Sequence, residues 1–346
     1  MRRSRPMQLL LLGLVVVLVL AGLGVACAST PKEKIEAELL ALPKNAGLRS
    51  SGLERVTLPV DPVAFGIEEA TFVYARIGPF DAEAPARPPL VLVHGTPGSL
   101  FGWSEAVFGL QAREPEVRFR GLAQDREVWL LDVVGHGVTP HVPGTMTFQR
   151  GADWIGAFLR GMELDEVTVV GHSYGGEFAW RAALDHPERI TRLVLVDAAG
   201  IPRRDDEWLS EEVAMRELWL APYGYVLNSE ARVGPALQLH FHEPIAPERL
   251  TEMKRVLDNA ANWRATVELA RDENGTRVED LARVGQPTLL LWGADDHAYP
   301  PARFAEEFER RIPGATLVTL EGLGHYPHEE GPRAFNEALR AWLDAE

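Results

Sequence analysis

A short β-branched run that breaks into glycines on either side of one serine constrains this chain more than any other stretch. Val167 to Val170 are typical of a fully buried strand, and Phe178 to Leu184 begin an apolar helical stretch. The pentapeptide Gly171-His172-Ser173-Tyr174-Gly175 therefore lies at a strand-to-helix turn. A serine on so tight a turn holds strained backbone angles, and flanking glycines remove collisions with neighbouring side chains. The pattern predicts that Ser173 is a nucleophile.

The same turn has a simpler interpretation, in which glycines form a connection and the serine is merely solvated. The helix that follows favours the catalytic interpretation, because its free N–H groups and the positive end of its dipole point at the serine. We expect the N–H of Tyr174 to stabilise an oxyanion at this position.

Short apolar runs recur along the chain and are separated by helix-length segments. This pattern is typical of a parallel sheet whose two faces are covered by helices, and functional residues then lie just past the carboxyl ends of the strands. Two earlier runs, Leu53 to Val60 and Ala70 to Arg76, predict an opening hairpin. The predicted parallel strands are Leu90 to Val93, Glu127 to Leu131, Val167 to Val170, Leu193 to Val196, Thr288 to Leu291, and Thr316 to Leu320.

The loops after the first two of these strands carry further candidates. In His94-Gly95-Thr96-Pro97-Gly98, small residues allow close backbone approach, so the N–H of Thr96 is the second expected oxyanion donor, and His94 is expected to be structural. Asp132 follows the next strand, where an aspartate could attack carbon. We favour the alternative that Asp132 caps its own loop, since the elbow geometry belongs to Ser173.

The loops after the last two predicted strands supply what a serine lacks. A hydroxyl needs a base to accept its proton, and the base needs a carboxylate to hold it. One loop carries Asp295 and Asp296, and the other carries His325. We predict His325 as the base, and three aspartates are candidates for the acid: Asp295, Asp296, and Asp197, which follows the strand after the elbow.

From about Pro89 to Leu343 the chain resembles the α/β-hydrolase superfamily, especially its cap-bearing members, which include esterases, carbon–carbon bond hydrolases, perhydrolases and aminopeptidases. The resemblance implies Asp296 as the acid, because family members usually carry it at the third residue past the glycine of the Trp292-Gly293 pair, and the order Ser173, Asp296, His325 is the order of that family's triad. Asp295 is then expected to cap the turn, and Asp197 remains a second candidate, at a place from which some members draw the acid. Epoxide hydrolases and haloalkane dehalogenases look similar around the first loop but carry aspartate at the elbow, so Ser173 excludes their chemistry. The matching stretches are His94 to Gly98, Asp132 to Thr139, the Ser173 elbow, His186-Pro187-Glu188-Arg189, Trp292 to Asp296, and Gly324-His325.

Between Ile201 and about Val284 the strand pattern stops, and the resemblance implies a helical cap over the active site. Aromatic residues in such a segment more often form the core of the cap than touch substrate, yet they favour an apolar acyl or alcohol group. His240-Phe241-His242-Glu243 has metal-binding residue types, but without a third placed ligand we interpret it as surface. The cap's large apolar residues are Trp208, Leu209, Leu218, Trp219, Leu220, Tyr223, Tyr225 and Trp263.

The N-terminus has the features of an export signal. Arg2, Arg3 and Arg5 precede an uncharged apolar run from Met7 to Ala26. Cys27, in Gly24-Val25-Ala26-Cys27, resembles the lipidated cysteine of bacterial lipoproteins. Lipidation at Cys27, a retained helix and cleavage with full release remain three alternatives, two of which attach the protein to a membrane. Cys27 is the only cysteine, so the folded part has no disulfide and no thiolate metal site.

The chain is acidic, with a net charge of -15 that becomes -18 without the three leader arginines, which argues against nucleic acid as a partner. We predict an exported serine hydrolase that cleaves a carboxylic ester of a small, mainly apolar molecule and uses no cofactor and no metal. The alternatives are a carbon–carbon bond hydrolase, an aminopeptidase, or a non-catalytic binding protein of this fold. The expected organisation is a leader (1–29), a tether (30–52), a first core part (53–200), the cap (201–284) and a second core part (285–346).

Overall fold

An eight-stranded sheet runs through the protein in the order β1-β2-β4-β3-β5-β6-β7-β8. The structure is a computed structural model that describes residues 29–111, 117–208, 210–218 and 229–345. Strand β2 is antiparallel to both of its neighbours, β1 and β4, and strands β3 to β8 are all parallel to one another. The predicted fold class is therefore confirmed. The strands are β1 (Glu54–Pro59), β2 (Glu69–Ile77), β3 (Leu90–Val93), β4 (Val128–Leu131), β5 (Val167–His172), β6 (Ile190–Val196), β7 (Thr288–Gly293) and β8 (Thr316–Leu320).

Alternate residues of each central strand enter two separate hydrophobic clusters, one on each face of the sheet. In β6, Leu193 and Leu195 belong to one cluster, whereas Val194 and Val196 belong to the other. This is the period of two expected for a strand covered on both sides. The first face packs against α6 (Phe148–Gly161), α7 (Tyr174–Asp185) and α12 (Ala305–Arg311), and the second against α5 (Ser104–Phe108) and α14 (Pro332–Ala345).

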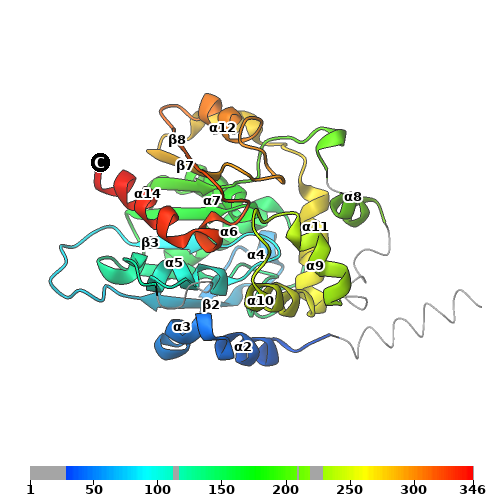
Figure 1. The fold of residues 1–346 in the computed structure, drawn as a ribbon, viewed down its shortest axis with the longest axis horizontal. Helices are drawn as coiled ribbons and strands as arrows, with labels where there is room; N and C mark the ends of the chain where they lie inside the picture. Colours follow the sequence, from blue (N-terminus) through cyan, green and yellow to red (C-terminus); the bar gives the residue numbers. More distant parts are fainter. Residues whose placement is uncertain (1–28, 112–116, 209, 219–228, 346) are drawn as a thin grey trace, which may run out of the picture.

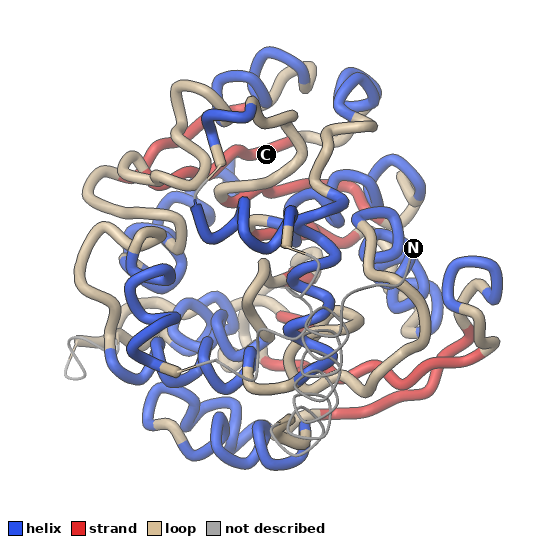
Figure 2. The backbone as a smooth tube through the Cα atoms, turned by 90° about the vertical axis from the view of Figure 1, so that its right-hand side faces the viewer, coloured by secondary structure: helices blue, strands red, loops and turns tan. Residues whose placement is uncertain are grey.

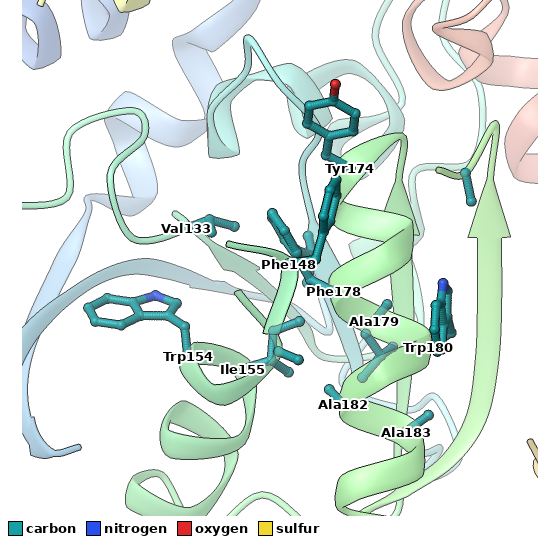
Figure 3. Packing of buried hydrophobic residues seen from close by; sticks show 14 of the residues in the cluster. Val133, Phe148, Trp154, Ile155, Tyr174, Phe178, Ala179, Trp180, Ala182 and Ala183 are labelled. Atoms are coloured by element: carbon teal, nitrogen blue, oxygen red, sulfur yellow. The ribbon is translucent and has the colours of Figure 1, made fainter. Parts of the chain in front are cut away.

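Helices α6 and α7 make a large contact on the first face. Ile155 lies on the side of α6 that faces α7, whereas Trp154 points away from α7 (Figure 3) and stacks on Phe72. Phe178 of α7 packs directly on α6, since a Cβ at Gly151 of α6 would lie 2.4 Å from its ring. The helix that follows Ser173 is therefore locked against its neighbour along its buried side.

The last strand differs from the prediction of apolar runs buried on both faces. Thr316 and Thr319 of β8 are exposed, and Leu317 and Val318 are only half-buried. The reason is position: β8 pairs only with β7 and ends the sheet. An edge strand needs less apolar surface than a central one, and threonine supplies the β propensity instead.

Residues 30–52 correct the prediction of a tether. They form α2 (Lys32–Ala41), a 3₁₀ turn (Pro43–Asn45) and α3 (Ala46–Ser51), which lie along one side of the molecule (Figure 1). Ile35 and Leu39, one helical turn apart, and Leu48 of α3 are fully buried against the second face of the sheet. The segment is therefore part of the core, and its apolar spacing was the signal for it.

The predicted leader, with Cys27, lies outside the described residues. Within the ranges that the structure describes, no helix has both the length and the apolar character needed to cross a membrane.

Among the residues of the predicted cap that the structure describes, four α-helices lie between β6 and β7: α8 (Ser210–Glu217), α9 (Glu230–Gln238), α10 (Pro247–Leu257) and α11 (Ala260–Asp272). They gather on the right-hand side of the molecule in Figure 1, which is the side that faces the viewer in Figure 2. The cap ends earlier than predicted, because Val278, Leu281 and Val284 already pack in the cluster on the first face of the sheet. The short helices α4 (Pro62–Phe65) and α13 (Pro327–Glu330) complete the elements used below.

Candidate active site

Ser173 sits between β5 and α7 with a strained backbone. Its φ is 54° and its ψ is -124°, a conformation that side-chain-bearing residues rarely adopt. The flanking glycines are required by contacts: a Cβ at Gly171 would lie 2.3 Å from the carbonyl oxygen of Gly175, and one at Gly175 would lie 2.4 Å from that of His94. The turn thus has the geometry predicted from the pentapeptide, with Ser173 at its tip.

Ser173, His325 and Asp296 form one hydrogen-bonded chain. Asp296 Oδ2 lies 2.8 Å from His325 Nδ1, and His325 Nε2 lies 3.0 Å from Ser173 Oγ. The carboxylate can only accept, so Nδ1 of His325 carries the hydrogen and Nε2 accepts from the serine hydroxyl. All three side chains are buried. The structure therefore brings together the three residues that the sequence selected, from the ends of β5, β7 and β8.

Asp296 is held as a carboxylate by its surroundings. Its second oxygen, Oδ1, accepts from the N–H groups of Ala298 (2.8 Å) and Tyr299 (3.1 Å). Burial by itself raises the pKa of this carboxyl, but His325 and the N–H of Tyr299 outweigh burial and lower the pKa of Asp296 to about 2. A permanent negative charge next to His325 stabilises the imidazolium that forms when that ring takes a proton.

The two other candidate acids occupy different environments. Asp295 is partly exposed, and its Oδ2 lies 3.3 Å from Nδ1 of the cap residue His242. Asp295 therefore pairs with the cap, whereas the sequence predicts that it caps its own turn. Asp197 is fully buried and accepts from the N–H of Gly293 at 2.9 Å. One of its carboxyl oxygens lies within 4.8 Å of a carboxyl oxygen of Asp296 and of a ring nitrogen of His325. Burial and the neighbouring Asp296 carboxylate raise the pKa of Asp197 well above its usual range, which favours the neutral carboxylic acid form of Asp197.

The loop after β3 lies against the serine. A Cβ at Gly95 would lie 2.6 Å from Cβ of Ser173, which shows how closely the loop backbone approaches it. His136 fixes the next residue: its Nδ1 donates to the carbonyl oxygen of Val134 (3.0 Å), so its Nε2 accepts from Thr96 Oγ1 (2.7 Å). The N–H of Thr96 has no hydrogen-bond partner among the described residues. This leaves the predicted donor available beside Ser173.

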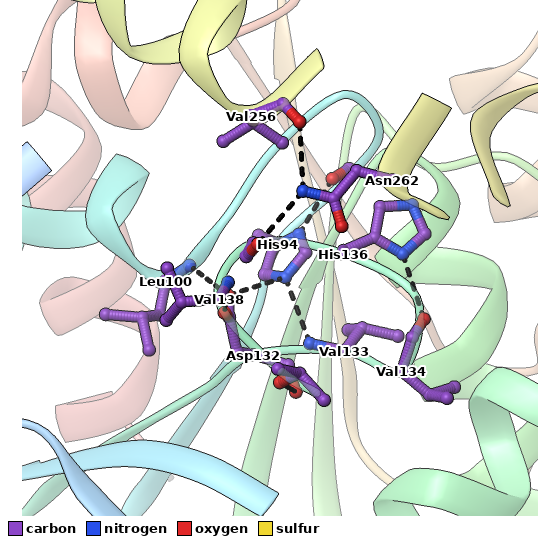
Figure 4. A network of polar contacts seen from close by, with 12 residues as sticks. His94, Leu100, Asp132, Val133, Val134, His136, Val138, Val256 and Asn262 are labelled. Atoms are coloured by element: carbon purple, nitrogen blue, oxygen red, sulfur yellow. Dashed lines mark hydrogen bonds and ion pairs between the residues drawn. The ribbon is translucent and has the colours of Figure 1, made fainter. Parts of the chain in front are cut away.

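His94 and Asp132 have the structural roles expected of them (Figure 4). His94 Nε2 accepts from the N–H of Val133 at 3.1 Å, and Asp132 accepts from the N–H groups of Leu100 (2.9 Å) and Val138 (2.6 Å). Although burial raises the pKa of Asp132, these hydrogen bonds and His94 bring it below its usual value. With both oxygens engaged, Asp132 fixes two loops and does not point at the serine.

A cavity of about 100 Å³ lies over the serine, between the core and the cap. The core contributes Ser173, His325 and the loop residue Thr96, and helices α9, α10 and α11 contribute mainly apolar side chains. No carboxylate is among the described residues that line it. Its described lining is Thr96, Pro97, Ser173, Tyr174, Met215, Val233, Ala236, Leu237, His240, Leu257, Trp263, Thr266, Ala270, Ala298, Tyr299, His325 and Tyr326.

Comparison with known families assigns this arrangement. The sequence model of the alpha/beta hydrolase family matches residues 90–338, which include every element of the site from the β3 loop to His325. The chain belongs to the alpha/beta hydrolase family.

Relatives of this hydrolase include enzymes that act on esters. It is 30% identical over 280 residues to the sn-1-specific diacylglycerol lipase ABHD11 of Xenopus tropicalis, covering 77% of this chain and 81% of that one. It is 26% identical over 261 residues to the esterase YbfF of Escherichia coli, covering 74% and 93%. Among solved structures, a membrane phospholipase A described as a bacterial virulence factor superposes with a TM-score of 0.67 at 24% identity, over 98% of each chain. The last comparison supports the fold.

Two features of the hydrolase site were not predicted. His240, interpreted as surface from the sequence, lines the cavity, and Phe241 is buried, whereas His242 and Glu243 are exposed as expected. Glu273, at the end of α11, accepts from the hydroxyls of Tyr174 (2.7 Å) and Tyr299 (2.9 Å), which joins the cap to the core beneath the cavity. Neither has a local sequence signal, because each depends on how the cap settles on the sheet.

Three of the cap's large apolar residues lie among the described ones, Trp208, Trp263 and Leu218, and Leu218 is exposed, so the expectation that most of them form the core of the cap stays a prediction. Trp208 packs under the guanidinium groups of Arg203 and Arg216, at 4.7 and 4.0 Å from the ring centroid. Trp263 instead lines the cavity. Leu209, Trp219, Leu220, Tyr223 and Tyr225 lie outside the described residues.

Proposed function

We propose that this hydrolase cleaves a carboxylic ester of a small, mainly apolar molecule through an acyl-enzyme, with Ser173 as the nucleophile. The observation that carries the proposal is the unbroken hydrogen-bond chain from Ser173 Oγ through His325 to Asp296 at the base of an apolar cavity. Relatives named as an esterase and a diacylglycerol lipase are consistent with an ester substrate.

In the first half-reaction, Ser173 Oγ attacks the carbonyl carbon while its proton passes to Nε2 of His325. The carbonyl oxygen becomes an oxyanion, which the N–H groups of Thr96 and Tyr174 stabilise. Asp296 keeps His325 in the required tautomer and balances its positive charge. The carbon–oxygen bond to the alcohol then breaks, and His325 returns the proton to the departing oxygen.

In the second half-reaction, water attacks the acyl carbon of the Ser173 ester and gives a proton to His325 Nε2. The bond between the acyl carbon and Ser173 Oγ breaks, the proton returns to Oγ, and the carboxylic acid leaves. Every proton is carried by the chain's own residues, so the proposal requires no cofactor and no metal.

The character of the cavity supports an ester over the peptidase alternative. An aminopeptidase must hold a substrate ammonium group, usually with a carboxylate, and the described lining contains none. A cavity of about 100 Å³ among the described residues supports a small group at this site. Carbon–carbon bond hydrolysis on the same triad remains the second candidate, and a non-catalytic binding role the third.

We further propose that the protein is exported and attached to a membrane through the N-terminal segment, by lipid on Cys27 or by a retained helix. The support is the arginine-flanked apolar run from Met7 to Ala26. Comparing the membrane fractions of wild type and Cys27→Ala separates the two modes. A released variant supports lipidation, and a variant that stays in the membrane supports the helix.

A substrate screen tests the proposed reaction. Chromogenic esters of graded acyl length are compared with amides, lactones and diketones at equal concentration. The proposal predicts the highest kcat/KM for short esters. Faster cleavage of diketones or of N-terminal amides would move the function to one of the alternatives.

A further inference from the structure

One short segment of the cap, residues 240–242, contacts the loop of the triad histidine through its backbone. The N–H of His325 donates to the carbonyl oxygen of His240 at 2.9 Å, and the N–H of His242 donates to Glu330 Oε2 at 2.8 Å. Between them, the ring of Phe241 stacks on that of Tyr326 with centroids 4.7 Å apart and planes 10° apart. The segment is therefore fixed to the histidine loop by its backbone and by an aromatic pair.

Gly324 is what permits this contact. A Cβ at Gly324 would lie 2.9 Å from the carbonyl oxygen of His240 and 2.7 Å from the nitrogen of His242. Any side chain there would push the cap segment away from the loop. The position of His240 is thus set by backbone contacts and does not depend on its own side chain.

The imidazole of His240 faces the cavity, and its ring centroid lies 5.6 Å from that of His325. Its Nδ1 is buried and has no hydrogen-bond partner among the described residues. Burial, together with the nearby His325, lowers the pKa of His240 to about 3, so the ring is neutral and offers one donor and one acceptor.

Three hydroxyls in the cavity wall are already used by the protein. Thr96 Oγ1 bonds to His136, Thr266 Oγ1 donates to the carbonyl oxygen of Asn262 at 3.0 Å, and Tyr299 donates to Glu273. A buried nitrogen without a partner is unfavourable unless a ligand supplies one. His240 is therefore a polar group that the cavity wall holds ready for a ligand.

The reaction places the alcohol part of an ester at this point. His325 must return its proton to the departing alcohol oxygen, so the alcohol lies beside His325. His240 is the cap residue that lies beside the same ring. We infer that His240 hydrogen-bonds a polar group on the alcohol part of the substrate, so that esters of hydroxylated alcohols are preferred over esters of plain alkyl alcohols. This inference rests on the proposed ester hydrolysis and names its substrate class.

Two esters of equal size test it. 2-Hydroxyethyl butyrate and propyl butyrate have the same acyl group and the same number of heavy atoms, and they differ by a hydroxyl in place of a methyl. The ratio of their kcat/KM values is measured in wild type, His240→Phe and His240→Gln. We expect wild type to favour the hydroxyethyl ester, and His240→Phe to lower the ratio about tenfold, as for one neutral hydrogen bond. His240→Gln keeps a donor and an acceptor and should retain part of the preference.

The matched control is His242→Phe, the same substitution two residues away on a side chain that does not line the cavity. It should leave the ratio unchanged, and thermal unfolding of all variants shows that they are folded. An active enzyme whose ratio is the same in wild type and His240→Phe overturns this inference and leaves the proposed function standing. A wild-type protein that cleaves neither butyrate nor p-nitrophenyl acetate overturns both.

Discussion

The two walls of the cavity are built in opposite ways. On the core wall, each reactive group is held by a hydrogen bond to another: Ser173 to His325, and His325 to Asp296. On the cap wall, the lining is mainly apolar, and the imidazole of His240 has a buried nitrogen without a partner. This difference indicates that the reaction and the selection of the substrate depend on different walls. Chemistry depends on geometry that the sheet fixes, and selection depends on groups that the cap leaves available.

The largest expected effect is on the core wall. Ser173→Ala removes the nucleophile and should lower kcat/KM for a short ester by several orders of magnitude, because the triad acts as a unit. The control is Ser99→Ala, at another buried serine, which should stay within a few-fold of wild type. Similar losses in the two variants would show that the effect comes from packing.

The next effect distinguishes two neighbouring carboxyl groups. Asp296→Asn should lower kcat about a thousandfold or more at pH 7 to 8, because the amide leaves His325 in the wrong tautomer. Asp197→Asn should cost less than about tenfold, because the raised pKa of Asp197 favours its neutral form and an amide of the same shape can still donate. The opposite ranking would move the triad acid to the loop after β6.

A smaller effect concerns how the cap is held. Arg249 of α10 is buried between Glu252 and Glu329, with nitrogen–oxygen distances of 2.7 Å to each, and so links the cap to the histidine loop. Arg249→Met removes the positive charge that pairs with the buried carboxylates of Glu252 and Glu329. It should lower the free energy of unfolding, measured in urea, by about 3–5 kcal/mol.

The control lies on the same helix. Arg255 is about one-third exposed and pairs with Glu38 and Asp258. Arg255→Met should therefore change the free energy of unfolding by less than about 1 kcal/mol. Equal losses in the two variants would contradict the view that the buried contact fastens the cap.

The smallest effect is expected at the N-terminus. Deleting residues 1–29 removes no group of either wall, so kcat/KM for a soluble ester should stay within about twofold of wild type. Extending the deletion to residue 52 should abolish soluble folding, since Ile35, Leu39 and Leu48 are part of the core. A soluble and active product of the longer deletion would return this segment to the status of a tether.

The residues of the core wall could be predicted from the sequence because the patterns that mark them are local. The strand runs gave β3 to β8, and glycines around Ser173, Asp296 and His325 marked the loops at the strand ends. The ranking of Asp296 above Asp295 came from the resemblance to the family, whose members usually carry the acid at this place in the loop. The residues of the cap wall could not be predicted, since their contacts join segments that are distant in the sequence: His240 lies beside His325, which is 85 residues later in the chain.

The N-terminal segment shows the same limit. Its prolines and charges suggested a tether, but two apolar residues of α2 at helical spacing were enough to dock it on the sheet. Lys44, in the turn after α2, then reaches a buried ion pair with Glu252 of the cap at 2.6 Å. A single lysine in a polar stretch carries no indication of such a partner.

The central claim is that Ser173 attacks the substrate and carries its acyl group. The most direct test is to treat the protein with an alkyl organophosphonate, digest it, and locate the adduct by mass spectrometry. The account predicts one stoichiometric adduct on the peptide that contains Ser173, with loss of esterase activity in step with labelling and no adduct in Ser173→Ala. An adduct on another residue, or full ester hydrolysis by a protein in which Ser173 stays unlabelled, would contradict it.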